Sequence, residues 1–415
     1  MKKLVALLLA VAMVLSMAAC QKTEAPAVDT AEPSVEATDA PAAEKETVTL
    51  KVWGAQDDQT MLGEMIEAFK AAHPDKEYAI ELAVVGEPDA KARYLEDPAA
   101  AADVFAFSND QLKDLVEAGA LYEVSGAYKD TVLAENGEGS IGAVTLNDKL
   151  YAFPMTADNG YFLYYDKSVI DETAVQSLDG MLAAANAAGK KVFMDLSNGW
   201  YIASFFLGAG CTLGIDEEGK QVCDFNGEKG LAAAEALKAF AADPAFMTGD
   251  DAVLQGGMGD TLCAGVSGTW NASAMIEKLG DNYAAAKLPT FTVNGEQVQL
   301  SSFAGYKCIG VSKLTKSPVD AMELAAWLTN EENQIKRFTD RAMGPSNIKA
   351  AANEAVLADP ALAALAAQGA YAVSQNDVLG NYWAPAEAFG ALMEAKDYSS
   401  SLQEQLDAMT AQIVG

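Results

Sequence analysis

The chain has 415 residues, of which 51% are apolar and 21% are charged. This length exceeds what one ordinary hydrophobic core needs, so two domains are expected. Acidic residues outnumber basic ones by 59 to 28, which gives a formal net charge of −31. Such an acidic surface repels phosphate backbones and anionic headgroups, which argues against nucleic acid as a partner and is typical of proteins soluble outside the cell.

The first 20 residues carry the pattern of an export signal. Lys2 and Lys3 precede an apolar run over residues 4–15, and small residues then lead to Cys20. The run is shorter than the about 20 residues that span a bilayer. The segment resembles a bacterial lipoprotein signal, with Met17 in place of the usual Leu. We expect a signal peptide over residues 1–19 and diacylation of Cys20, with simple secretion and a free Cys20 as the alternative.

Residues 20–46 are predicted to be a lipid-anchored, disordered linker. They carry three prolines among Ala, Glu, Thr and Asp, with no aromatic residue and almost no large aliphatic one. Such a composition cannot bury enough apolar surface to fold. We therefore expect a flexible tether between the membrane and the folded body.

The folded body alternates strand and helix patterns. Apolar and polar residues alternate over 48–53, and a helix with one apolar face follows and ends at His73-Pro74. Further strands are predicted over 80–85, 103–107, 161–165, 191–194, 263–266 and 307–311, with helices from 110, over 200–207 and over 230–242, and a largely helical Ala-rich end. Alternating strands and helices predict an α/β fold with largely parallel sheets.

Four cysteines follow Cys20, and an even number in an exported protein suggests disulfides. Cys211 and Cys223 flank a plausible hairpin turn, so we expect a bridge between them. Cys263–Cys308 is the pairing that then remains, and buried free thiols are the alternative.

Catalytic and metal-binding patterns are sparse. His73 is the only histidine and no C-x-x-C occurs, which argues against a His-based triad and a metal site; we expect no cofactor and no enzyme. The patterns Ser346–Lys349 and Ser374–Asn376 match short motifs of penicillin-recognising enzymes, but no K-T-G follows them. Paired loop carboxylates leave a cell-surface glycoside hydrolase as a remaining enzyme hypothesis.

Several patterns together resemble the extracellular solute-binding proteins of ABC importers, in particular the carbohydrate group that includes maltose-binding protein. The resemblance covers nearly all of residues 47–415. Its most specific stretch is the strand 103–107, followed by Ser108-Asn109-Asp110 and a helix that ends in Gly119 before Leu121. Gln111 stands where the maltose binder carries a basic residue, and Asn198 stands where the family carries an acid.

The resemblance implies a two-lobed periplasmic-binding-protein-like fold of type II, with hinge strands between the lobes. We expect lobe 1 to comprise residues 47–156 and 292–343, and lobe 2 residues 157–288 and 347–415. Residues 288–291 resemble a hinge strand, and residues 343–347 resemble the later return crossing. By the same resemblance the ligand-binding residues are Asp57, Asp58, Phe107, Asn109, Asp110, Asp158, Asn198, Trp200, Trp270, Tyr382 and Trp383.

These residue types suit a sugar, which has apolar ring faces and a polar rim. Aromatic rings can cover the faces, and carboxylates can accept hydrogen bonds from the hydroxyls. We therefore expect a monomer, lipid-anchored on the outer face of the bacterial cell membrane, that binds a mono- or oligosaccharide between its lobes and delivers it to an ABC transporter permease. The alternative solutes are a polyamine, a peptide or a metal chelate, and the acidic site favours a cation over an anion.

Overall fold

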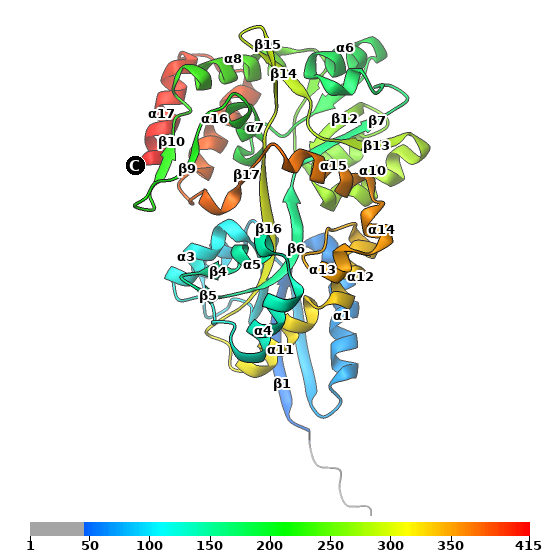
Figure 1. Cartoon of the computed structure of the whole chain (residues 1–415), viewed down its shortest axis with the longest axis vertical. Helices are drawn as coiled ribbons and strands as arrows, with labels where there is room; N and C mark the ends of the chain where they lie inside the picture. The colour runs from blue at the N-terminus through cyan, green and yellow to red at the C-terminus, as the bar shows by residue number, and fades with distance from the viewer. Residues whose placement is uncertain (1–44) are drawn as a thin grey trace, which may run out of the picture. The chain divides into compact units, whose positions relative to one another are not determined.

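The computed structural model describes residues 45–415, so the expected signal peptide, Cys20 and nearly all of the expected linker lie outside the described residues. Residues 45–415 form two α/β lobes, each built on a mixed sheet (Figure 1). Each lobe has a hydrophobic core of its own. The predicted α/β fold with two lobes is confirmed, but the sheets are mixed and not largely parallel as expected.

The first lobe is built on a sheet of six strands. Its order is β17-β16-β3-β1-β2, and β6 also pairs with β16. The strands are β1 (Thr47–Gly54), β2 (Glu77–Val84), β3 (Val104–Ser108), β6 (Phe153–Gly160), β16 (Ser302–Val311) and β17 (Ala372–Ser374). β1 runs parallel to β2 and β3, whereas β16 runs antiparallel to β3 and β6. The helices include α1 (Gln59–Ala72), α2 (Ala90–Glu96), α3 (Leu112–Glu117), α4 (Gly126–Glu135), α5 (Glu138–Ala143), α11 (Pro318–Leu328) and α12 (Glu331–Arg341).

The second lobe contains a sheet in the order β11-β8-β12-β7-β13. Its strands are β7 (Phe162–Asp166), β8 (Lys191–Phe193), β11 (Phe246–Met247), β12 (Leu262–Ser267) and β13 (Tyr283–Ala286). β8 runs parallel to β11 and β12, and β7 runs antiparallel to β12 and β13. The helices include α6 (Leu178–Ala188), α7 (Gly199–Gly208), α8 (Glu228–Ala242), α9 (Asp251–Gly257), α10 (Ala272–Leu279), α15 (Pro360–Gly369), α16 (Trp383–Ala395) and α17 (Leu402–Val414).

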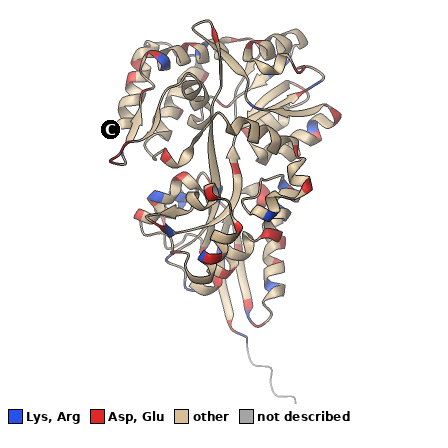
Figure 2. Cartoon of the chain, viewed as in Figure 1, with Lys and Arg blue, Asp and Glu red and all other residues tan. Residues whose placement is uncertain are grey.

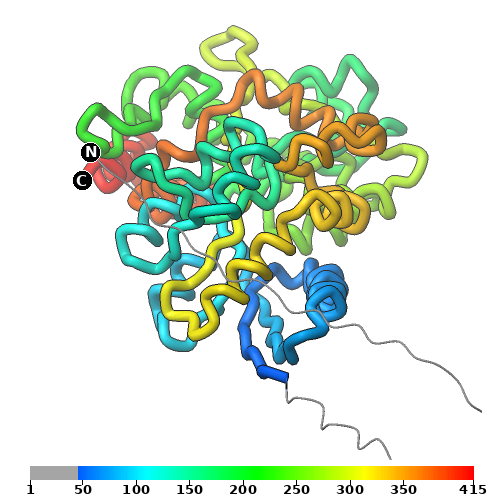
Figure 3. The backbone as a smooth tube through the Cα atoms, turned by 60° about the horizontal axis from the view of Figure 1, so that its bottom comes forward, coloured from blue at the N-terminus to red at the C-terminus, as the bar shows by residue number. Residues whose placement is uncertain are grey.

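Short elements complete the described chain. They include the hairpins β4–β5 (Thr145–Leu146, Lys149–Leu150), β9–β10 (Leu213–Ile215, Gln221–Cys223) and β14–β15 (Thr290–Val293, Glu296–Gln299), and the helices α13 (Ile348–Ala351) and α14 (Glu354–Leu357). Single 3-10 turns include η1 (Gln56–Asp58), η2 (Asn109–Gln111), η3 (Ala174–Gln176), η4 (Thr269–Asn271), η5 (Gly280–Asn282) and η6 (Gln375–Asp377). Figure 3 shows α17, in red, beside the β9–β10 hairpin, in green, against which it packs.

Hydrophobic periodicity accounts for the first elements of the chain. In β1 alternate residues Val48, Leu50 and Val52 are at most 2% exposed, as a strand with one buried face requires. In α1 the buried residues Met61, Met65, Ile66 and Phe69 recur at helical spacing, so the predicted amphipathic helix is confirmed. Each such side chain contributes about 1.5–3 kcal/mol through burial.

Two long antiparallel strands, β6 and β16, connect the lobes. Phe303, near the start of β16, lies in the core of the second lobe, whereas Cys308 and Ile309 lie in that of the first. Residues 288–291, expected to form a hinge strand between the lobes, belong to the second lobe instead, because Leu288 and Phe291 both pack in its core. The hairpin β14–β15 likewise contacts α6 and α8 of the second lobe, although the expected boundary placed residues from 292 in the first.

The expected disulfides are not present in the described residues. Cys211, Cys223, Cys263 and Cys308 are all free. Cys263 lies in the core of the second lobe and Cys308 in that of the first, so the expected Cys263–Cys308 bridge is wrong. The predicted hairpin between Cys211 and Cys223 does form as β9–β10, but with both thiols unbridged.

Acidic residues are spread over both lobes (Figure 2). In residues 45–415 we find no helix that is long and apolar enough to cross a membrane. The same residues contain no group of three or more His, Cys, Asp or Glu side chains that could hold a metal ion.

Candidate functional site: a cleft between the two lobes

Each lobe offers polar loops at the carboxyl ends of two neighbouring parallel strands. In the first lobe β1 leads into η1 and β3 leads into η2. In the second lobe β8 leads toward the start of α7, and β12 leads into η4. Parallel neighbours end at the same edge of a sheet, which is where α/β proteins bind ligands.

These loops line one cleft with a volume of about 610 Å³. This volume is within the range of small-molecule sites. Seven of the eleven predicted ligand-binding residues line it: Asp57, Asp58, Asp110, Asn198, Trp200, Trp270 and Trp383. The cleft draws these residues from both lobes, so a solute inside it can contact both.

The N-terminus of α7 positions Trp200 in the cleft. The side chain of Asn198 accepts a hydrogen bond of 3.0 Å from the backbone N–H of Trp200, and so caps the helix. The Trp200 indole Nε1 donates a bond of 3.0 Å to Oε1 of Gln375, a residue of η6. Asn198 therefore has a structural role as well as a place in the cleft.

Trp270 owes its position to the glycine two residues before it. A Cβ at Gly268 would lie 2.0 Å from the Trp270 ring, so only glycine allows the ring to fold back on this turn. The indole Nε1 of Trp270 donates to Oδ2 of Asp251 at 3.1 Å. The rings of Trp200 and Trp270 lie 5.8 Å apart between centroids, at 38° to each other. Together they present an apolar wall that can cover the face of a sugar ring.

Acidic residues of the first lobe are held by basic ones. Arg341 donates through Nε to Oδ1 of Asp58 at 3.0 Å, and its Nη2 lies 3.4 Å from Oδ2 of Asp57. Lys307 Nζ lies 3.8 Å from Oε1 of Glu87. These pairs fix the carboxylates at the cleft and compensate their charge in a partly desolvated setting.

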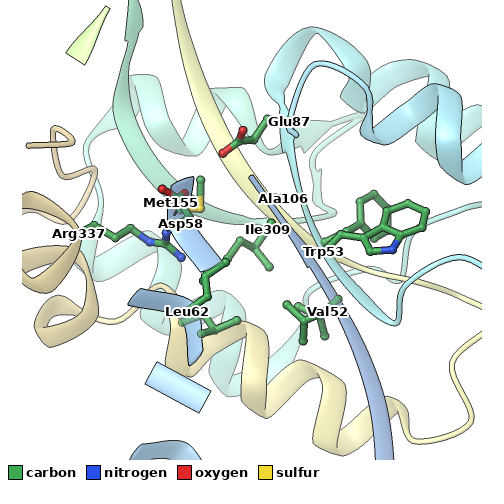
Figure 4. Close-up of a pocket in the computed structure, with 13 residues that line it drawn as sticks. Val52, Trp53, Asp58, Leu62, Glu87, Ala106, Met155, Ile309 and Arg337 are labelled. Atoms are coloured by element: carbon green, nitrogen blue, oxygen red, sulfur yellow. Dashed lines mark ion pairs between the residues drawn. The ribbon is translucent and has the colours of Figure 1, made fainter. Parts of the chain in front are cut away.

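Asp58 and Glu87 also border a small internal cavity of about 10 Å³ (Figure 4). Such a volume is about the minimum that holds one water molecule. The guanidinium of Arg337 lies beside it, 2% exposed and 3.9 Å from Oδ2 of Asp58. The Nε and Nη2 of Arg337 have no hydrogen-bond partner among the residues described. Besides Arg341, a second and buried cation, Arg337, therefore lies close to the carboxylate of Asp58.

Asp110 is the most perturbed acid of the cleft. Burial raises the pKa of its carboxyl to about 7, although Lys91 and the hydrogen bond from Gln375 act in the opposite direction. That bond runs from Gln375 Nε2 to Asp110 Oδ1 at 2.8 Å. Asp110 thus changes charge near neutral pH at the edge of the cleft.

Four predicted site residues do not line the cleft. Phe107 lies in the core of the first lobe, and Tyr382 lies in that of the second, where its hydroxyl donates to the carbonyl of Gly199. Asp158 is buried, with Oδ2 accepting from the hydroxyl of Thr269 and from the backbone N–H of Gly344. Asn109 is buried and accepts from the N–H of Tyr306. Each of the four is adjacent in sequence to a residue that lines the cleft, but none of them lines it.

The cleft also contains polar residues that the sequence did not indicate, including Glu87, Asp89, Lys91, Asp251, Lys307, Arg341, Gln375 and Glu387. Glu87 follows β2, the outer parallel neighbour of β1, so the rule that ligands bind at the carboxyl ends of parallel strands could have indicated it. Lys307 lies inside a strand and Gln375 in a distant 3-10 turn, where no local pattern marks them.

Two α/β lobes connected by paired strands, with a polar and aromatic cleft between them, define a two-lobed solute-binding protein of the type II periplasmic-binding-protein fold. Residues 64–364 match the family described as bacterial extracellular solute-binding protein, and the chain belongs to this family. It is therefore a binding protein and not an enzyme.

Among its relatives is the galactooligosaccharide-binding protein of Bacillus subtilis (strain 168), 27% identical over 411 residues that cover 93% of this chain and 91% of the relative. The maltodextrin-binding protein MdxE of the same organism is 30% identical over 281 residues, 62% of this chain and 63% of the relative. A solved structure described as a complex with acarbose is 33% identical, with a TM-score of 0.80 over 89% of this chain and 99% of that one.

Proposed function

We propose that the chain binds an oligosaccharide of the maltodextrin or galactooligosaccharide class in its interlobe cleft and delivers it to the permease of an ABC transporter. The observation that carries this proposal is the pairing of three tryptophans with hydrogen-bonded carboxylates in one cleft, namely Trp200, Trp270 and Trp383 with Asp57, Asp58 and Asp110. Rings cover sugar faces, and carboxylates accept hydrogen bonds from hydroxyls. The oligosaccharide-binding relatives, and the similar structure with acarbose, support the same class.

Delivery follows from a ligand that contacts both lobes. Such a ligand favours the conformation in which the lobes are closed, and a permease that recognises this conformation receives loaded protein selectively. Diacylation of Cys20 would keep the protein at the membrane surface, with residues 21–46 as its tether.

A cationic solute such as a polyamine is the second candidate. Within residues 45–415, the cleft acids Asp89, Asp251 and Glu387 have no ion-pair partner. An amine could compensate these charges, whereas a neutral sugar leaves them to hydrogen bonds.

Calorimetric titration and thermal unfolding of residues 45–415 test the two candidates. The panel is maltotriose, maltotetraose, galactotriose, spermidine and a tripeptide. A ligand present at 100 times its dissociation constant adds about 2.7 kcal/mol to the free energy of unfolding. Stabilisation by one sugar series alone supports the proposal and names the series. Stabilisation by spermidine or the tripeptide, with none by any sugar, overturns it.

A further inference from the structure

Lys307 brings an ammonium group into the cleft from one of the two strands that connect the lobes. Its side chain is only 10% exposed, and it lines the cleft. No residue within 45–415 accepts a hydrogen bond from Nζ; the nearest carboxylate, Glu87, is 3.8 Å away. An ammonium has three N–H donors, so those of Lys307 can serve a solute that enters the cleft.

The electrostatic surroundings keep this ammonium charged. Burial alone lowers the pKa of Lys307, but Glu87, Asp158 and Asp58 together outweigh burial and the repulsion from Arg337, so the pKa is raised. The group therefore remains a charged donor throughout the physiological pH range. A charged donor forms the stronger class of hydrogen bond with an incoming acceptor.

Lys307 also faces an aromatic ring of the opposite lobe. Its Nζ lies 5.2 Å from the centroid of the Trp270 ring, within the range of a cation–π contact. The Trp270 ring is held by Asp251 and packs beside Trp200. Because the ammonium already lies over the Trp270 ring, a sugar unit that contacts Trp270 from the cleft also meets Nζ of Lys307.

Gln111, by contrast, does not act as the donor at the position where the maltose binder carries a base. Its Nε2 donates to the carbonyls of Glu87 and Pro88, and its Oε1 accepts from the N–H of Lys91. The amide of Gln111 is thus used to hold the loop 86–91. Two lysines line this part of the cleft: Lys91, whose Nζ lies 2.6 Å from Oδ2 of Asp114, and Lys307 of β16.

We infer that Lys307 is a specificity-determining residue of the cleft, which donates hydrogen bonds to the hydroxyl and ring oxygens of the sugar unit that lies beside Trp270. This inference rests on the proposed function. The ammonium of Lys307 favours a sugar unit beside Trp270 that is uncharged and rich in hydrogen-bond acceptors. It disfavours an amino-substituted unit, since two ammonium groups would repel each other.

The first experiment compares Lys307→Met with wild type by calorimetric titration with maltotetraose and galactotriose. We expect a loss of affinity of tenfold or more for the sugar that the wild type binds. The control is Lys190→Met, which removes a half-buried lysine bonded to the carbonyl of Gly259, outside the cleft, and leaves affinity unchanged. If the wild type binds neither sugar, the proposed function fails; if it binds and Lys307→Met binds equally well, this inference alone fails.

A second pair of variants separates ligand contact from charge compensation. Lys307→Met leaves Glu87 without its cation and could weaken binding through misfolding. The double variant Glu87→Gln/Lys307→Met is therefore compared with the single variant Glu87→Gln. Neither contains the Glu87 carboxylate, so the two differ only in the lysine and no unpaired charge arises at position 87. Affinity at least tenfold weaker in the double variant than in Glu87→Gln, at matched unfolding temperature without ligand, supports donation to the ligand. Equal affinities of the two show that Lys307 only compensates Glu87, and overturn the inference.

Discussion

The indole N–H of Trp200 donates a hydrogen bond of 3.0 Å to the side-chain oxygen of Gln375, 175 residues further along the chain. The other end of the same amide donates to Asp110 at 2.8 Å. Gln375 is 4% exposed and lies in η6, beside η2. One amide therefore holds a ring from the second lobe and a carboxylate from the first in a fixed relation across the cleft.

Replacement of Gln375 by Glu tests this relation. The isosteric carboxylate keeps an acceptor for Trp200 but places a like charge beside Asp110. We expect the affinity for the bound oligosaccharide to fall at least tenfold at pH 8 and less at pH 6, where Asp110 is protonated. Calorimetric titration at both pH values measures the effect. The matched control is Gln412→Glu, an exposed position on α17; an equal loss in both variants would refute the role of Gln375.

Gly305, on the connecting strand β16, makes room for this arrangement. A Cβ there would lie 2.9 Å from the side-chain oxygens of both Asn109 and Gln375. Since both are buried, Gly305→Ala must displace one of them, at about 1–3 kcal/mol for overpacking. We expect a lower unfolding temperature and an affinity reduced by threefold or more. Gly256→Ala in α9, where a Cβ meets nothing within 4 Å, is the control and leaves both quantities unchanged or slightly raised.

The sequence predicts the parts of the cleft that follow parallel strands. Asp57, Asp110 and Trp270 each follow an apolar strand within three residues, and parallel strands bring their carboxyl ends together. Phe107 shows the limit of that reasoning, because β3 is buried on both faces and an aromatic residue inside it packs in the core. In a strand with no exposed face, alternation cannot show which side chains reach a ligand.

Other site residues depend on tertiary relations that no local pattern encodes. Lys307 reaches the cleft only because β16 passes from one lobe to the other, and Gln375 only because η6 lies against η2. The pairing of Cys263 with Cys308 was wrong for the same reason. The pairing follows from elimination alone, whereas the topology places the two residues in separate cores.

Asp110 gives the stability a defined pH dependence. Its pKa in the folded protein is raised to about 7, whereas an unfolded chain has an aspartate pKa of about 3.9. The folded state therefore binds more protons between these values, and stability falls as pH rises from about 4 to about 7 and then levels. Lys91, Asp114 and Cys308 are the titratable groups that face this carboxyl.

Asp110→Asn removes this contribution. The variant is expected to gain stability relative to wild type at pH 8 and to differ little at pH 5, because only the charged carboxylate is penalised by burial. Urea unfolding without ligand at pH 5 and pH 8 measures the difference. Asp130→Asn, at an exposed position on α4, serves as control and shows no such change with pH. A stability difference independent of pH in Asp110→Asn would contradict the assignment.

Removal of Arg337 has two opposing effects on stability, one through its own unsatisfied donors and one through the acids that it compensates. It is buried, lies 3.9 Å from Asp58 and has two nitrogens without a hydrogen-bond partner among the described residues. Its loss removes an unsatisfied cation but leaves Asp58, Glu87 and Asp158 with only Lys307 and Arg341 as nearby bases. Uncompensated buried charge costs more than the unsatisfied donors, about 3 kcal/mol or more by analogy with broken buried pairs.

We therefore expect Arg337→Met to lower the free energy of unfolding by about 3 kcal/mol in urea titration at pH 7. Asp58→Asn/Arg337→Met removes one charge of each sign and should recover part of that loss, since the remaining acids and bases again balance. The two single variants and the double variant form a thermodynamic cycle whose coupling energy reports the interaction between the two residues. A double variant no more stable than Arg337→Met would show that Arg337 stabilises the fold through packing and not through charge. The methionine leaves the same gap beside the cavity of Figure 4 whether residue 58 is Asp or Asn.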